Sequence, residues 1–260
     1  MLDWIACLGQ RSVATMQSLG FSVRFLLMVL FRKPKLRQLI PEFLEQLYFV
    51  GLLSCLIIMV SGLFIGMVVG LQGYHTLERF GAESQLGALL ALSIARELGP
   101  VIGALLFAGR AGSSLTAGIG LMKATEQLSS MDMMGVDPLG RIILPRFLAV
   151  LVALPLLTLI FSAVAIFGGY LIGVVWLGVD SGSFWSNMQA AVDLKQDVLS
   201  GVLKSEIFAL IIVWIAMFKG FTCVATAEGI SQATTRTVVF SSLAVLGFDF
   251  LLTAMMIGGW

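Results

Sequence analysis

Residues 46–77 read QLYFVGLLSCLIIMVSGLFIGMVVGLQGYHTL and contain no Asp, Glu, Lys or Arg. A helix crosses a bilayer with about 20 mostly apolar residues, so this run is longer than one crossing. The whole chain has the same character, because 58% of its 260 residues are hydrophobic and 12% are charged. Soluble domains carry roughly 25% charged residues, which excludes an ordinary soluble enzyme. The sequence predicts an all-α integral membrane protein.

Four more apolar stretches follow the first one, and each is long enough to cross a membrane. They cover residues 80–109, 147–179, 198–218 and 237–260. We expect Pro41 to begin the first helix, since proline is favoured at the first helical position. The prediction is a single domain over residues 1–260, in which residues 41–260 form a bundle of five spans.

Residues 1–40 precede this bundle. Six residues there recur at steps of three and four: Val13, Met16, Gly20, Val23, Leu27 and Leu30. This pattern predicts an amphipathic helix on the inner leaflet, with the basic cluster that ends at Arg37 against anionic headgroups. The alternative is a sixth, short span. No small-residue cleavage site follows the apolar part, so a cleaved signal peptide is not indicated.

The orientation follows from Lys and Arg, which are in excess in cytoplasmic loops. Six of them lie before residue 41, four in residues 110–146 and two in residues 219–236. The other side has only Arg79 and Lys195. We expect a cytoplasmic N-terminus and a periplasmic C-terminus.

Five charged residues interrupt the later spans: Arg96, Glu97, Lys204, Glu206 and Asp249. We counted from the charges that mark each cytoplasmic end, at a rise of about 1.5 Å per residue. All five then lie roughly 20–22 Å from the inner boundary. Charges at this depth are costly, so they should pair or line a wet cavity. Lys204 with Asp249 is the preferred pair, which leaves Arg96 and Glu97 to face a cavity.

Two other interpretations of these charges remain open. In the first, all five charges only stabilise the bundle through internal ion pairs. In the second, Glu97, Glu206 and Asp249 form a proton relay in a channel or secondary transporter. A hydrolase is disfavoured, because the one histidine, His75, has no Ser/His or Cys/His arrangement around it.

Gly62, Gly66 and Gly70 form a stripe of small residues on the first span. Such a stripe lets two helices approach closely. It serves either packing within the chain or a dimer seam.

Residues 110–146 are too polar to span. We expect a short helix outside the membrane, with one face made of Leu121, Leu128, Met131 and Met134. Gly135 and Pro138 give the stop signal.

Four blocks of the sequence are specific enough to suggest a family. They are FIGMVVGLQGY (64–74), ARELGPVIGALLFAGRAGSSLTA (95–117), GLMKATEQLSSMDMMGVDPLGRIILPR (120–146) and SQATTRTVVFSSLAVLGFDFLLTA (231–254). Together they closely resemble the MlaE family of permeases, and the resemblance covers essentially the whole chain.

The resemblance implies the membrane subunit of an ABC transporter in a Gram-negative inner membrane. Such a transporter moves glycerophospholipid between inner and outer membrane and maintains outer-membrane lipid asymmetry. The implied partners are a second copy of the chain, a cytosolic ATPase, a periplasmic hexamer of MCE-domain subunits and a cytosolic STAS-domain subunit.

The resemblance also implies roles for residues. The helix in 110–146 would be the coupling helix that docks on the ATPase, through Lys123, Glu126, Gln127, Asp132 and Asp137. The outer ends of the first two spans would hold lipid tails, with Val69, Leu77 and Phe80 in the wall. Arg96 and Glu97 would face the lipid, since an arginine can pair with a phosphate.

The chain itself lacks an ATP site. The nearest stretch to GxxxxGK[ST] is GIGLMKAT, which has Met122 in place of the second glycine. We therefore expect ATP and Mg on the partner ATPase and no cofactor here. Three scattered cysteines predict neither disulfide nor metal site, and a net charge of +1 predicts no nucleic-acid surface.

Overall fold

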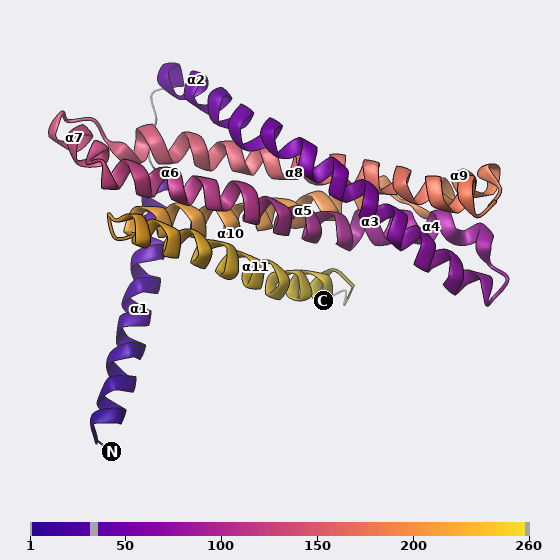
Figure 1. Ribbon diagram of the computed structural model, residues 1–260, viewed down its shortest axis with the longest axis horizontal. Coiled ribbons are helices and arrows are strands. Elements are labelled where there is room, and N and C mark those ends of the chain that lie inside the picture. Colours follow the sequence, from indigo (N-terminus) through magenta and orange to yellow (C-terminus); the bar gives the residue numbers. More distant parts are fainter. Residues whose placement is uncertain (1, 32–35, 258–260) are drawn as a thin grey trace.

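Figure 1 shows a computed structural model of the chain. It describes residues 2–31 and 36–257, with side chains for residues 16–31, 39–193 and 195–256. These residues form helices and no strand. Five helical stretches are long and apolar enough to cross a membrane: Leu39–Glu78, Glu83–Ala124, Leu139–Trp176, Lys195–Thr222 and Ala227–Met256. The all-α fold and the five spans are confirmed.

The spans contain the following helices. The first is α2 (Leu36–Leu47) and α3 (Leu53–Glu78), the second α4 (Leu86–Ser93), α5 (Gly99–Phe107) and α6 (Ser113–Ala124), the third α8 (Leu144–Tyr170), the fourth α10 (Leu199–Thr222) and the fifth α11 (Ala227–Ile257). Short π-helical turns continue them at Tyr48–Leu52, Ile94–Leu98, Ala108–Gly112, Leu139–Ile143, Leu171–Trp176 and Leu194–Val198. Two short helices, α7 (Gln127–Met133) and α9 (Ser181–Ala191), lie towards opposite ends of the bundle (Figure 1).

All five spans extend further than predicted at the end that bears α7. The second reaches Ala124 instead of residue 109, and the fifth begins at Ala227 instead of residue 237. The prediction that Pro41 begins a helix is wrong, because Pro41 lies inside α2. Polar residues can continue a helix outside the bilayer, since its backbone hydrogen bonds do not require apolar side chains. Hydropathy therefore marks where a span is apolar and does not mark where its helix ends.

The glycine stripe of α3 packs within the chain. Gly62, Gly66 and Gly70 are buried, and a Cβ atom at Gly66 would lie 1.8 Å from the carbonyl oxygen of Ala165 on α8. Gly70 similarly faces Gly169. Four residues further along α3, from Gly66 to Gly70, the contact on α8 also moves four residues further, from Ala165 to Gly169. The two helices therefore run parallel. Of the two interpretations of the stripe, the packing within the chain is confirmed.

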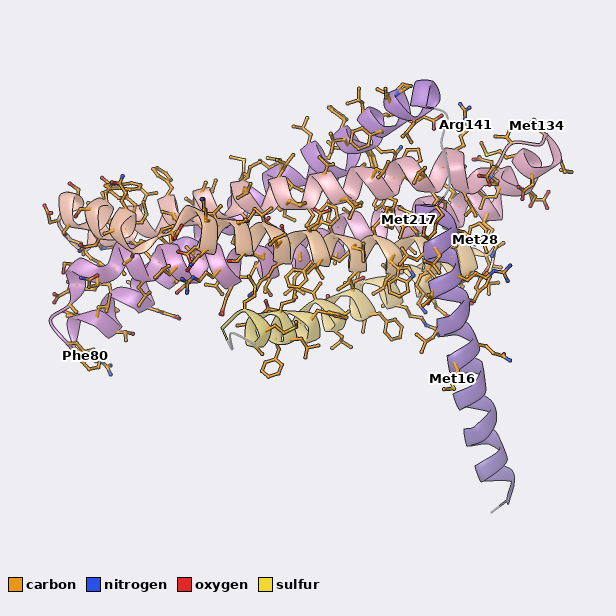
Figure 2. The ribbon with its side chains drawn as sticks, turned by 180° about the vertical axis from the view of Figure 1, so that it is seen from behind. Met16, Met28, Phe80, Met134, Arg141 and Met217 are labelled. Carbon is orange, nitrogen blue, oxygen red and sulfur yellow. The ribbon has the colours of Figure 1, made fainter. Side chains whose placement is uncertain are left out.

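Helix α1 (Leu2–Leu30) leaves the bundle near the end that carries α7 and runs crosswise to the spans (Figure 1). Trp214 of α10 donates an indole hydrogen bond of 2.9 Å to the carbonyl of Ser22, and Phe25 packs against Phe218. Met16 and Leu27 are exposed on α1, and Figure 2 shows Met16 about halfway along this helix, away from the bundle. The side chain of Val13 and the predicted basic cluster lie outside the described residues. The interfacial position of α1 stays a prediction.

The segment 110–146 contains less loop than predicted. Residues 113–124 continue the second span as α6, and α7 is the only separate helix in this segment. The predicted shared face is wrong, because Leu121 lies on α6 and is exposed, as is Met134, while Leu128 is buried. Gly135 has a φ of +71°, which agrees with the predicted stop. Glycine adopts this conformation at little cost, so the chain turns there.

Candidate functional site

A charged cavity lies between the second, fourth and fifth spans, and its volume is about 800 Å³. Arg96 and Glu97 come from the π-helical turn Ile94–Leu98, in which the amide of Gly99 bonds to the carbonyl of Ile94, five residues earlier. Pro100 follows directly and has no amide hydrogen to donate to the carbonyl of Arg96. The widened turn thus coincides with the two charged residues. Apolar side chains complete the walls, among them Leu92, Leu199, Leu203 and Met256.

Arg96 has an ion-pair partner that the sequence analysis did not identify. Its Nε atom donates to Asp197 Oδ1 at 2.6 Å, and its Nη2 atom lies 2.5 Å from the same oxygen. The Asp197 side chain is 1% exposed, whereas that of Arg96 is 50% exposed. Asp197 Oδ2 also accepts the backbone amide of Asp193 at 2.8 Å. Arg96 is therefore fixed on one side and open to the cavity on the other.

Asp197 did have a signal in the sequence. It precedes Lys204 by seven residues, and seven residues at about 100° each return to nearly the same face of a helix. Residues before 198 lie outside the apolar run that predicts the fourth span, and the orientation depends on Lys and Arg alone. Hydropathy and the basic residues therefore did not reveal this acidic residue in the cavity wall.

Lys204 and Asp249 come together in the structure. Lys204 Nζ lies 3.4 Å from Asp249 Oδ1 and donates to Thr253 Oγ1 at 2.7 Å. The two side chains are 4% and 22% exposed. Lys204 lines the charged cavity, and so do Arg96 and Glu97. Thr253 is a second site residue that the sequence analysis missed, since it lies one helical turn after Asp249 on α11.

Glu97 and Glu206, which were predicted at the same depth, have different surroundings in the structure. Glu97 lines the charged cavity, and no hydrogen bond or ion pair links it to another of the described residues. Glu206 is exposed on α10 and is not among the residues that line the cavity. Asp249 does not line the cavity either, so of the three carboxylates proposed for a relay only Glu97 lies in its wall.

The predicted depth of the five charges depends on where each span ends. Arg110 does not mark the cytoplasmic end of the second span, because the helix continues through it to Ala124. Arg110 Nη1 donates to Ser54 Oγ at 2.7 Å and to the carbonyl of Phe49 at 3.2 Å. Arg110 thus joins the second span to the π-helical turn Tyr48–Leu52.

The expected lipid wall lies elsewhere on the molecule. Val69 and Leu77 are half-buried against the core from α3, and Phe80 is 80% exposed beyond the end of α3. None of the three lines the charged cavity. Figure 2 shows Phe80 at the end of the bundle opposite Met134 and Arg141.

The five expected coupling residues divide into two groups. Lys123 Nζ donates to the carbonyls of Phe221 and Cys223 at 2.9 and 2.8 Å, and Asp137 Oδ2 accepts the amide of Gly140 at 2.8 Å. These two side chains therefore bind backbone within the chain. The other three, Glu126, Gln127 and Asp132, are exposed on or beside α7.

The surface of α7 also contains residues that the sequence analysis assigned differently or omitted. Met133 and Met134 are 82% and 71% exposed, while Leu128 anchors the helix in the core. The two methionines and the three polar residues are all exposed at this end of the bundle. Methionine is flexible and adapts to a partner's surface.

Comparisons with known proteins agree over almost the whole chain. The family model described as Permease MlaE matches residues 43–255. The intermembrane phospholipid transport system permease protein MlaE of Haemophilus influenzae is 55% identical over 258 residues, which cover 99% of both chains. A probable ABC transporter permease protein of Rickettsia bellii is 34% identical over 98% of both. The chloroplastic protein TRIGALACTOSYLDIACYLGLYCEROL 1 of Arabidopsis thaliana is 32% identical over 83% of this chain and 61% of its own length.

Proposed function

Because this chain belongs to the MlaE permease family, we propose that it is the membrane subunit of an ABC transporter for phospholipids. It moves glycerophospholipid between the inner and outer membranes and so maintains the lipid asymmetry of the outer membrane. The name of the Haemophilus influenzae relative supports this substrate. The chain is a multi-pass protein of the bacterial inner membrane, with its N-terminus in the cytoplasm and its C-terminus in the periplasm.

The observation that carries the proposal is the charged cavity among three membrane spans. Leu92, Leu199 and Leu203 supply apolar wall that suits acyl chains, and the open side of Arg96 suits a phosphate. A guanidinium in a low-dielectric site binds a phosphate more strongly than the same group in water. In this proposal Asp197 positions Arg96 for the phosphate, whereas Lys204 is paired with Asp249 and does not bind it.

The energy comes from a separate subunit in this proposal. The chain has no phosphate-binding loop, so a cytosolic ATPase binds ATP and Mg and hydrolyses the nucleotide. We place its docking surface on α7, at Glu126, Gln127 and Asp132, together with Met133 and Met134. The name of the Rickettsia bellii relative, a probable ABC transporter permease protein, supports an ATPase partner.

Three further partners belong to the same proposal. Two copies of the chain form a homodimer, a hexamer of MCE-domain subunits stands on the periplasmic side, and a STAS-domain subunit binds in the cytosol. The long exposed apolar surface of α11, which includes Leu243 and Phe250, supports a second copy in contact with this helix.

Reconstitution tests the function. The chain is purified in mild detergent with its genomic neighbours, placed in vesicles and supplied with fluorescent phospholipid. We expect an ATPase to co-purify and phospholipid transfer to require ATP. Transfer driven by a proton gradient without ATP would instead support the relay.

The role of Arg96 is tested in the same vesicles. We expect Arg96→Ala to reduce transfer at least tenfold, while Arg24→Ala, at an exposed position on α1 outside the cavity, leaves transfer unchanged. Transfer that persists at the wild-type rate in Arg96→Ala would contradict the role of Arg96.

A further inference from the structure

A second cavity lies behind the π-helical turn that carries Arg96, and its volume is about 410 Å³. Its walls come from the second, third and fourth spans, from Met188 and Gln189 of α9 and from Val192, which follows α9. The charged cavity is lined by Arg96 and Ser200, while this apolar cavity is lined by their neighbours Ala95 and Gly201. The two cavities therefore lie on different sides of the same two helices.

The lining of the apolar cavity contains no Asp, Glu, Lys or Arg. Its two hydroxyl groups donate within α8, from Thr158 to the carbonyl of Pro155 at 2.8 Å and from Ser162 to the carbonyl of Thr158 at 2.9 Å. The one amide side chain is Gln189, on α9. A charged ligand would lose its hydration in this cavity and gain no ionic partner. The chemistry of the walls therefore selects a hydrocarbon.

The position of the cavity selects a hydrocarbon that comes from the membrane. Its α8 residues run from Thr158 to Ile166, beside the glycine seam with α3. Within and directly beside this stretch of α8, Ile160, Leu156 and Phe167 are exposed although they are apolar. Exposed aliphatic and aromatic side chains on a span face lipid tails. Leu159 is 41% exposed and Ala163 is exposed, so the cavity opens between them into this lipid layer.

Small residues keep the inner walls of the cavity rigid. A Cβ atom at Gly201 would lie 2.3 Å from the carbonyl oxygen of Ala95, and one at Gly103 would lie 2.7 Å from Thr158 Cγ2. The helices therefore touch on both sides of the space and cannot close it by moving together. Because this cavity cannot collapse and borders lipid tails, a hydrocarbon chain fills it at the lowest cost in free energy.

We propose that the apolar cavity holds one acyl chain of a bilayer phospholipid, at a site separate from the charged cavity. The chain enters between Leu159 and Ala163, and the lipid's glycerol region lies towards Gln189, whose amide can hydrogen-bond an ester carbonyl. A lipid held there supports the turn that carries Arg96 from behind. The site goes beyond the proposed function, because the cargo of the transporter binds on the other side of that turn.

Counting bound lipid tests the proposal. Ala163→Phe puts an aromatic ring at the mouth of the cavity, and Val152→Phe puts the same ring at an exposed position of α8 that does not line it. The complex with its ATPase is washed extensively in detergent and its intact mass is measured. We expect Ala163→Phe to retain one phospholipid fewer per copy of this chain than the wild type and Val152→Phe. Equal counts in the three proteins would overturn the proposal.

Arg96→Ala separates this site from the cargo site. We expect this variant to lose phospholipid from the charged cavity and to keep the one that Ala163→Phe removes. If the charged cavity holds no cargo, the count of Arg96→Ala equals that of the wild type while Ala163→Phe still loses one, which supports the second site alone. Loss of all bound phospholipid in Arg96→Ala would show a single site and overturn the proposal.

Photocrosslinking identifies the occupant. Leu159 is replaced by p-benzoylphenylalanine in the full complex, which is irradiated in native membranes and analysed by mass spectrometry. An adduct with the mass of a phospholipid supports the proposal. An adduct with a polypeptide would show that a partner's helix fills the cavity, and this would overturn it.

Discussion

The glycine seam between α3 and α8 and the charged layer around Arg96 and Lys204 lie at nearly the same level of the bundle, since Gly99, three residues after Arg96, contacts Ser162 of α8. The seam brings backbones together and leaves no room for a single added methyl group at Gly66. The charged layer keeps helices apart around about 800 Å³. The second span therefore has the rigid glycine seam on one side and the open charged cavity on the other.

The difference shows how the chain stabilises charged side chains inside a membrane. At the seam, close packing supplies the stability, because lipid tails leave little hydrophobic drive between helices. At the charged layer, Asp197 and Asp249 each offset one cation. Changes at the seam should act on folding, and changes in the charged layer should act on folding and function together.

The largest effect is expected at the seam. Gly66→Ala puts a methyl group against the backbone of Ala165, which cannot rotate away, so the helices must separate. We expect a loss of about 3 kcal/mol of stability or more, seen as a low yield of monodisperse protein and a lower melting temperature in detergent. Gly118→Ala on α6 is the control, since nothing beyond its own stretch of helix lies within 4 Å of its Cβ position. A Gly66→Ala protein as stable as this control would contradict the seam.

The next largest effect is expected at the buried pair. Lys204→Met leaves the carboxylate of Asp249 without its cation, and we expect a loss of about 2 kcal/mol. The double variant Lys204→Met/Asp249→Leu removes both charges and should recover part of that loss. Thermal melting of the two singles and the double gives the coupling energy. Losses that simply add would show that the two side chains do not interact.

A smaller effect is expected at Asp197. Asp197→Ala removes the acceptor of Arg96 and of the Asp193 amide, and we expect a loss of about 1–2 kcal/mol because Arg96 is half exposed. Phospholipid transfer per folded complex should fall as well, since Arg96 is no longer positioned. Asp132→Ala, on the exposed surface of α7, should leave melting unchanged. Wild-type transfer in Asp197→Ala would limit Asp197 to a structural role.

The smallest effect on stability is expected at Lys123. Lys123→Met removes two hydrogen bonds, to the carbonyls of Phe221 in α10 and of Cys223 directly after it, and should cost about 1 kcal/mol. It should leave binding of the ATPase to the folded protein unchanged, whereas Gln127→Ala should weaken that binding and leave melting unchanged. Pull-down of the ATPase, normalised to folded protein, distinguishes the two. Weakened binding in Lys123→Met at normal stability would return Lys123 to the docking surface.

Much of the fold followed from local sequence patterns. Uncharged runs gave five spans, and the interruptions at Arg96 and Lys204 gave residues that line the charged cavity. Helix ends did not follow, as Pro41 and Ala124 show, because polar residues extend a helix without any hydropathy signal. Asp197 was missed for the same reason, since it lies where the apolar run has not yet begun.

The role of the glycine stripe needed the partner helix. A stripe of small residues packs equally well on a helix of the same chain or of a second copy, and only the position of Ala165 decides between them. Lys123 is a second example, because the family resemblance implied a docking role for it while its ammonium group binds a carbonyl at the end of α10. The carbonyls that it binds are about 100 residues away in the sequence.

The sequence by itself determined that this chain spans a membrane five times, which family it resembles and which charges lie within its spans. These properties depend on composition and spacing along one helix, where each residue's free energy in the bilayer is set mainly by its own side chain. Only the tertiary structure decided which charges pair, which glycines meet a backbone and where two cavities remain open. Those properties depend on contacts between residues far apart in the chain, because side chains and backbones of separate helices must occupy or leave the same space.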